Sequence, residues 1–423
     1  MDEHFQTDTE RIAFGRAEVD ALLTRPAPTK KGASPPLACL ENLNIILTRD
    51  PVIGFRIGFD AFRRAHTWDR KATTDEEETR VNTEIQIVYG LRCPTALMRE
   101  AFCAAALRRE FHPVRDYRGG LVWDGVPRAD SILLRYAGAA DTALNRALGR
   151  RWLRSCVARV LEPGCKVDTV LILVGPQGAG KSSFFRAMMP RREWFSDTPI
   201  DFSHKDAYAQ MQGIWVYELA ELGGMRARDA ETIKAFLAAG VDRFRPPYAR
   251  NVVELTRQNV FVGSTNEAEF LDDPTGARRF WPVRVGEVDL EALEADRDQL
   301  WAEVYEEMTP GVGRPLPPWW LSPEEDAELA EDQVVYTRGD PWGDIVAAWT
   351  SPQHVTEIGV TAADIRDGVT VAHVLGAVLA IDVGQQHKAA AMRVAGILTR
   401  LGWRKKKGSF NGRRESRWFL STS

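Results

Sequence analysis

One segment near the middle of the chain constrains the fold more than any other. The apolar run 170–174 leads directly into a glycine-rich loop, 175–182, of the form G-x-x-x-x-G-K-S, and helical spacing follows. A strand before such a loop and a helix after it form the setting in which backbone N–H groups curl around phosphates. The sequence therefore predicts an α/β fold that binds ATP with Mg²⁺.

The residue types in this glycine loop assign its chemistry. Lys181 is expected to reach the β- and γ-phosphates, and the Ser182 hydroxyl is expected to ligate Mg²⁺. The predicted nucleotide-binding residues are the whole loop and the residue after it: Gly175, Pro176, Gln177, Gly178, Ala179, Gly180, Lys181, Ser182 and Ser183.

Two further apolar strands end in polar residues. The first, 213–217, is followed by Glu218 and Glu221. We expect Glu218 to hold the metal and Glu221 to polarise the attacking water, although a glutamate at a helix start is also often a plain surface residue. The second strand, 259–263, precedes Asn266, expected to touch the γ-phosphate and the water; a turn-forming asparagine is the alternative.

Two adjacent arginines, Arg278 and Arg279, follow these strands. Either can act as an arginine finger on the nucleotide of a neighbouring subunit, which is worth about 10³ to 10⁵ in rate in comparable systems. Paired arginines are more often solvated or salt-bridged, so this prediction depends on the order of the motifs.

Composition excludes several classes of protein. The 423 residues carry 55 Lys+Arg and 59 Asp+Glu, and a net charge of -4 rules out a uniformly basic coat protein. No apolar run approaches the ~20 residues of a membrane-spanning helix, and the N-terminus lacks a signal-peptide pattern. Five cysteines without a C-x-x-C pair favour reduced thiols. We expect a protein of the cytoplasm of a bacterial host cell.

Clusters of proline and glycine suggest the domain organisation. We expect a flexible tail or linker, an N-terminal domain, an ATPase core, a Pro-rich linker with an acidic helix, and a winged-helix domain, over residues 1–36, 37–150, 151–309, 310–340 and 341–423. Within them, strands are predicted at 44–47 and 52–59. Helices are predicted at 95–110, 129–136, 140–160 and 323–332.

The C-terminal segment has the pattern of a winged helix. Helices are predicted at 361–366, 372–379 and 388–401, followed by strands at 403–407 and 413–420. Residues 400–417 hold eight cations against Glu415 alone, which is typical of a DNA-contacting surface. The predicted contacts are Lys388, Arg393, Lys405, Lys406, Arg413 and Arg414. A winged helix that contacts protein is the alternative.

In this order, the motifs resemble those of superfamily 3 helicases, and more specifically the virulence-associated protein E family of phage and mobile-element replication proteins. The matching segments are 111–117, 123–128, 163–165, 175–182, 218–222, 233–236, 242–248, 264–266 and 275–282. The resemblance runs from about residue 37 to the C-terminus.

The resemblance implies a fold and partners that the spacing alone does not give. It implies an AAA+-like P-loop ATPase core, an N-terminal domain that is α/β or mainly helical, and a homo-oligomeric ring, usually a hexamer. The implied partners are single-stranded DNA, origin DNA, and a separate primase or other replication proteins, without a membrane. It also implies a hairpin that enters the ring channel, with DNA contacts at Lys234, Arg243, Arg245, Tyr248 and Arg250.

Three functions remain open at this stage. The first is an ATP-dependent DNA helicase that translocates on single-stranded DNA, and the second is an ATP-assembled initiator or DNA-binding ring with little motor activity. A phosphate-loop kinase of a small molecule is the third. The first requires ATP hydrolysis stimulated by single-stranded DNA, and the others do not.

Overall fold

The computed structural model describes residues 7–28, 34–202, 204, 206–220, 227–245, 251–267, 270, 277–309, 311, 315–336, 341–350, 367–410 and 413–420. The chain divides into two compact units, Met1–Tyr336 and Thr337–Ser423. Among the described residues, no helix combines the length and the apolar character needed to cross a membrane.

A five-stranded sheet forms the centre of the first unit. Its strands are β5 (Val170–Val174), β6 (Phe195–Ser196), β7 (Val216–Ala220), β10 (Val260–Thr265) and β11 (Phe280–Arg284), in the spatial order β11-β5-β10-β7-β6. Every pairing is parallel, so the carboxyl ends of all the strands meet at one edge. The predicted α/β class and the strand before the glycine loop are confirmed.

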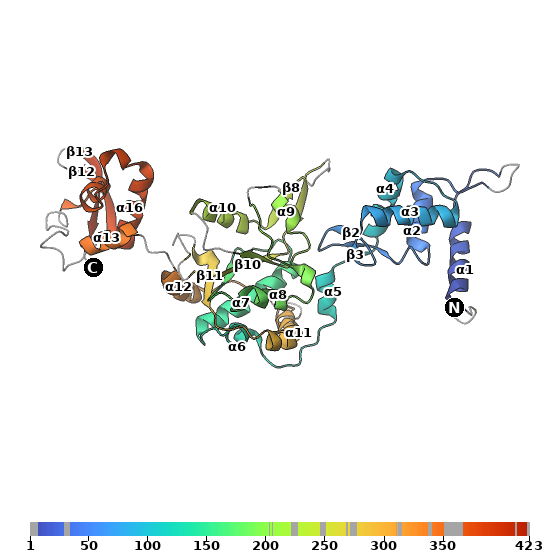
Figure 1. Cartoon of the computed structure of the whole chain (residues 1–423), viewed down its shortest axis with the longest axis horizontal. Helices are drawn as coiled ribbons and strands as arrows, with labels where there is room; N and C mark the ends of the chain where they lie inside the picture. The colour runs from blue at the N-terminus through green and yellow to red at the C-terminus, as the bar shows by residue number, and fades with distance from the viewer. Residues whose placement is uncertain are drawn as a thin grey trace. The chain divides into compact units, whose positions relative to one another are not determined.

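Helices cover both faces of this sheet (Figure 1). Leu171 and Leu173 share a core with residues of α7 (Ala143–Leu161), α8 (Lys181–Met188) and α11 (Leu290–Glu307). Val170 and Ile172 share a second core with residues of α9 (Asp206–Gln210) and α10 (Ala227–Leu237). Burial on both faces explains why β5 is apolar at every position.

Shorter elements complete this unit. They are α5 (Pro113–Gly119), η1 (Ala129–Ser131), α6 (Ile132–Ala137), η2 (Arg192–Trp194), η4 (Ala277–Arg279), α12 (Pro323–Asp332) and η5 (Gln333–Tyr336). The predicted acidic helix coincides with α12, which begins with a capping box between Ser322 and Glu325.

The N-terminal segment has a core of its own. Its elements are α1 (Asp8–Ala21), α2 (Leu40–Arg49), β1 (Ile57–Asp60), β2 (Ala65–Trp68), β3 (Lys71–Ala72), α3 (Asp75–Tyr89), α4 (Thr95–Leu107) and β4 (Glu110–Phe111). The four strands form one mixed sheet, in the order β3-β2-β1-β4. The segment is therefore α/β rather than mainly helical.

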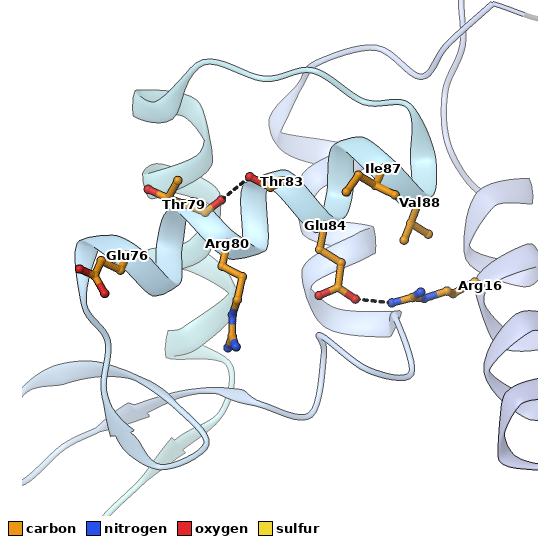
Figure 2. A pocket seen from close by; sticks show the side chains of 8 residues that line it. All are labelled: Arg16, Glu76, Thr79, Arg80, Thr83, Glu84, Ile87 and Val88. Carbon is orange, nitrogen blue, oxygen red and sulfur yellow. Dashed lines mark hydrogen bonds and ion pairs between the residues drawn. The ribbon is translucent and has the colours of Figure 1, made fainter.

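The prediction of a flexible tail is wrong for α1. Val19 of α1 and Leu23, which follows the helix, are buried in the N-terminal core, so the end of this helix is packed rather than loose. Arg16 of α1 donates to Asp50 at 3.2 Å and to Glu84 of α3 at 2.5 Å, the latter across an open pocket shown in Figure 2. A linker was predicted because proline and glycine residues follow the helix.

The prediction of a strand at 44–47 is also wrong, because these residues lie in α2. Leu43, Ile46 and Leu47 are fully buried on one side of the helix, at the i, i+3, i+4 spacing. Of the predicted strand 52–59, only residues 57–59 lie in a strand, β1, and the residues before them form turns. A short run of β-branched residues does not separate a buried strand from a buried helix.

An antiparallel hairpin extends from the part of the first unit that contains the five-stranded sheet. It consists of β8 (Val241–Phe244) and β9 (Val253–Thr256), in the span where the family resemblance placed one. At its root the buried Arg257 contacts Asp242 at 2.7 Å and donates to the carbonyl of Phe236. Gly164 and Gly240 meet closely there, and Gly240 has no room for a side chain because its Cβ would lie 2.4 Å from the carbonyl oxygen of Gly164.

The second unit contains α13 (Pro341–Thr350), α15 (Val371–His373), the π-helix η7 (Val374–Val378), η8 (Val383–Gln385) and α16 (Lys388–Arg400). Two long antiparallel strands follow, β12 (Trp403–Phe410) and β13 (Arg413–Leu420). The predicted hairpin and the helix before it are present, whereas the predicted helix 361–366 lies outside the described residues.

Replacement of Gly240 by alanine should destabilise the chain. The added Cβ would lie 2.4 Å from the carbonyl oxygen of Gly164. The backbone must shift to relieve this clash, at a cost of about 1–3 kcal/mol. We expect a lower melting temperature for Gly240→Ala by calorimetry. Gly119→Ala, whose Cβ meets no atom within 4 Å, is the control, and equal melting temperatures for the two variants would contradict the close contact.

Candidate active site

The glycine loop turns sharply to join β5 to α8. Gly178 and Gly180 have φ angles of 84° and 83°, a region in which only glycine is unstrained. Gly180 is the N-cap of α8, and a Cβ on it would lie 3.1 Å from Val288. The first-turn N–H groups of α8 have no partner within the helix, so the loop and the helix end can together receive an anion.

The ammonium group of Lys181 lies across this loop. Its Nζ donates to the carbonyl oxygens of Gly175 and Pro176 at 2.9 and 2.7 Å, and to Oδ1 of Asn266 at 2.7 Å. Burial lowers the pKa of Lys181, and the nearby Glu218 carboxylate acts in the opposite direction. The lysine is thus held by three oxygens, a role that phosphate oxygens can take over.

A buried carboxylate and two hydroxyls lie beside this lysine. Glu218 of β7 is 2% exposed, and its Oε1 accepts from Ser182 Oγ at 2.7 Å and from Ser264 Oγ at 2.6 Å. Its other oxygen, Oε2, is buried without a hydrogen-bond partner among the described residues. Mg²⁺ is bound by one or two carboxylates together with hydroxyls, waters and phosphates, so these oxygens suit the ion.

Sequence reasoning gave no role to Ser264. The sequence offered one indication of such a role, which is that Ser264 lies near the end of the third strand, two residues before Asn266. Since β10 lies between β5 and β7, a hydroxyl on β10 reaches the acidic residue of one neighbour and the loop serine of the other. Knowledge of the strand order was needed to see this.

Asn266 directly follows β10 and contacts Lys181, as its predicted position beside the loop requires. Glu221 lies outside the described residues. Of the polar residues predicted near the phosphates, the structure brings Lys181, Ser182, Glu218 and Asn266 together.

The two arginines lie at the other end of the sheet. They directly precede β11, whose first residue pairs with Val170, the first residue of β5. A strand of this length rises by about 13 Å, so Arg278 and Arg279 are far from the glycine loop of their own chain. Arg279 Nε lies 3.3 Å from Asp168 Oδ2, and Arg278 is exposed.

One predicted DNA contact of the first unit is wrong. Lys234 is only 6% exposed, because its position on α10 lies between the buried residues Ile233 and Phe236. Arg243 is exposed on β8, where it pairs with Glu254 at 2.8 Å, and Arg245 is exposed beyond the strand. Tyr248 and Arg250 lie outside the described residues.

The cations of the second unit differ in their surroundings. Lys388, Lys405 and Lys406 are exposed, and Lys406 Nζ lies 5.3 Å from the centre of the Phe419 ring. The guanidinium carbon of Arg393 lies 4.1 Å from the centre of the Trp342 ring. Arg413 and Arg414 lie on β13, with side chains outside the described residues.

Comparison with known proteins gives a family match over about half of the chain. A sequence model of the virulence-associated protein E-like domain matches residues 119–338. A search of curated proteins found no match.

Similar solved structures include three apo structures of the NrS-1 C-terminal region, two of them an A form. Their identities to this chain are 11%, 10% and 11%, with TM-scores of 0.47, 0.47 and 0.49. Each alignment covers 86% of this chain and 96% of the other.

Removal of the Ser264 hydroxyl should weaken metal binding. Ser264→Ala takes one of two donors from the Glu218 carboxylate, and loss of such a supporting group usually costs 10- to 100-fold in metal affinity. We expect at least about a tenfold higher Mg²⁺ requirement for nucleotide binding, measured by titration calorimetry. Ser264→Thr keeps the hydroxyl and serves as the control. An unchanged Mg²⁺ requirement in Ser264→Ala would show that this contact plays no part.

Proposed function

The chain belongs to the virulence-associated protein E-like family, and from this premise we propose that it is an ATP-dependent DNA helicase of phage or mobile-element replication. The proposal includes a ring of identical subunits that translocates on single-stranded DNA. The observation that supports it most is the cluster of Lys181, Ser182, Glu218 and Asn266 at one edge of a parallel sheet.

The proposed binding of ATP follows from this cluster. The N–H groups of the glycine loop and of the first turn of α8 surround the β-phosphate, and Lys181 exchanges its carbonyl partners for phosphate oxygens. Ser182 and Glu218 hold Mg²⁺, which when bound neutralises charge on the β- and γ-phosphates. Asn266 then remains beside the terminal phosphate, and Glu221 is proposed to polarise the attacking water.

The arrangement of strands suits an AAA+-like core. Because β10 separates β5 from β7, Asn266 lies between the phosphate loop and the acidic strand. An amide in that position can contact both a phosphate oxygen and a water held by the acidic strand. A small-molecule kinase needs no such sensor, which makes the kinase the weaker alternative.

The position of the arginines supports a ring. Arg278 and Arg279 lie just before β11, beside the first residue of β5, whereas the glycine loop follows the last residue of β5. They can therefore reach a nucleotide only on another copy. Contacts between opposite ends of identical subunits are head-to-tail, and such contacts form a ring where the rotation between subunits closes. We infer that one of the two arginines completes the neighbour's site.

Two surfaces are proposed to contact DNA. The exposed residues Arg243 and Arg245 on the β8–β9 hairpin would grip phosphates in the channel of the ring. The second unit, with α16 followed by the β12–β13 hairpin, is proposed to be a winged helix whose exposed Lys405 and Lys406 bind the DNA backbone.

One observation favours a second candidate, an ATP-assembled ring that binds DNA with little motor activity. The ion pair with Glu254 partly neutralises Arg243, whereas no ion pair of Lys405 or Lys406 occurs among the described residues. A ring that holds DNA mainly through the second unit would hydrolyse ATP slowly and without stimulation. The ATPase rate with and without single-stranded DNA separates the two candidates.

Replacement of Lys181 by alanine should abolish ATP hydrolysis. The variant loses the one cation that lies on the glycine loop, and we expect a fall of about 10²- to 10³-fold in the ATPase rate, with loss of unwinding. Hydrolysis is measured by phosphate release, and folding by circular dichroism. Lys71→Ala, at an exposed position on β3, is the control. Retained unwinding by Lys181→Ala would refute the motor.

Replacement of Lys405 and Lys406 by alanine should weaken DNA binding uniformly across sequences. Each phosphate contact releases condensed counterions, so the slope of log K against log salt should fall by about one per lysine lost. Fluorescence anisotropy over a salt series measures both effects. Unchanged affinity and slope would assign this unit to protein contacts instead.

A further inference from the structure

A histidine at the end of the N-terminal segment contacts the link between the β8–β9 hairpin and the five-stranded sheet. Nε2 of His112 lies 2.7 Å from Oε1 of Gln258. Gln258 is the middle residue of 257–259, the link that joins β9 to β10. The two residues are 146 positions apart in the chain, so only the folded structure brings them together.

Both ring nitrogens of His112 have a partner. Nδ1 accepts from the N–H of Arg115 at 3.3 Å, which caps α5. A nitrogen that accepts carries no proton, so in the neutral ring Nε2 carries it and donates to the amide oxygen of Gln258. Burial lowers the pKa of His112, which favours this neutral ring. The contact therefore has a defined donor and a defined acceptor.

The chain on either side of His112 is held. Before it, Phe111 of β4 pairs with Asp60 of β1. After it, the guanidinium of Arg115 donates from two nitrogens to the carbonyl oxygen of Val160, at 3.1 and 2.8 Å. Val160 lies near the end of α7 and belongs to the core that contains β5. His112 is thus fixed both to the N-terminal sheet and to the helices around the five-stranded sheet.

A turn of the N-terminal segment supports the imidazole ring. Oδ1 of Asp60 accepts from the N–H groups of Phe62 and Arg63, at 2.9 Å each, and so shapes the turn. Phe62 is 3% exposed and packs in the core that contains β5 rather than in the N-terminal core. Its ring centre lies 5.4 Å from that of His112. The ring that donates to Gln258 therefore packs against a buried side chain.

The position of Gln258 connects the hairpin to the candidate active site. On one side, Arg257 holds the hairpin through its contact with Asp242 of β8. On the other side, β10 leads to Ser264 and Asn266, which both contact residues of the active site. A displacement of the hairpin is passed along the chain to β10 through the residue that His112 holds.

We propose that the contact between His112 and Gln258 lets the N-terminal segment position this link, so that DNA on the hairpin changes the rate of ATP hydrolysis. Both are positioning residues, because they act through β10 rather than on the nucleotide. With the contact made, the hairpin and β10 move together. Without it, the link shifts while both of its ends stay folded. The inference rests on the proposed function and goes beyond it, because that function gives the N-terminal segment no role.

Two substitutions break the contact and spare the surrounding structure. His112→Asn keeps a favoured capping residue for α5, but the shorter side chain does not reach Gln258. Gln258→Leu removes the acceptor at similar size. In each variant, the ratio of ATPase rates with and without single-stranded DNA should fall by about 2- to 30-fold. The rate without DNA and the Kd for ATP should stay unchanged. An unchanged ratio in both variants would overturn the inference.

A rescue and a double variant separate this role from general damage. Gln258→Glu keeps an acceptor oxygen and should retain the stimulation by DNA that Gln258→Leu loses. The double variant with His112→Asn and Gln258→Leu should be no worse than either single variant, because all three lack the same contact. Additive losses would overturn the contact as the cause. Thr142→Asn, a matched replacement of the residue that caps α7, is the control and should keep the full ratio.

Hydrogen exchange followed by mass spectrometry tests the positioning without reference to activity. Peptides that cover 253–260 should exchange about 2- to 10-fold faster in His112→Asn than in the unsubstituted chain, because the link has lost one hydrogen bond. Peptides of α8 should exchange at the same rate in both. Equal exchange across the link would overturn the inference.

Failure of the proposed function gives a different result. If single-stranded DNA does not raise the ATPase rate of the unsubstituted chain, the helicase is refuted and the inference falls with it. If DNA stimulates the unsubstituted chain and both variants equally, the helicase stands and only the inference is refuted.

Discussion

The buried carboxylate of Glu218 is the constraint on which the arrangement of the candidate site depends. An ionised carboxylate away from water is costly unless hydrogen bonds or a cation compensate it. Here Ser182 and Ser264 donate to one oxygen, and the second oxygen has no hydrogen-bond partner among the described residues. A divalent cation at that oxygen would complete the compensation. The geometry that stabilises the buried Glu218 carboxylate is therefore also consistent with its proposed role as a metal ligand.

The sequence predicted this part of the molecule well because local pattern and chemistry agree there. The apolar run of β5, the glycine loop and the polar residues at the two further strands can all be read without tertiary information, although Glu218 lies within β7 and not after the strand as predicted. The order of the strands in the sheet cannot be read in this way. The role of Ser264 depends on the place of β10 between β5 and β7, so the sequence did not predict it. Lys234 was misjudged for a related reason, since only the packing of α10 shows that its side chain is buried.

The N-terminal segment was predicted less well because its helices are fixed by tertiary contacts. The proline-rich stretch after α1 resembles a linker, yet Asp50 accepts hydrogen bonds from Arg16 and from the Tyr89 hydroxyl and so ties α1 and α3 together. In α2, β-branched residues favour a strand by propensity, and burial of one helical face overrides this preference. Both errors arise where long-range packing outweighs local preference.

In the proposed helicase, the root of the β8–β9 hairpin offers a route from the nucleotide site to the DNA. Arg257 is 3% exposed and joins β8 to the end of α10, and only two residues separate it from β10, the strand that leads to Asn266. The N-terminal segment reaches the same place, since His112 Nε2 lies 2.7 Å from Gln258 Oε1. Main-chain hydrogen bonds from Gly164 to Arg257 and from Arg257 to Gly240 also hold the base of the hairpin. In the proposed motor, these contacts would couple the base of the hairpin to the rest of its subunit.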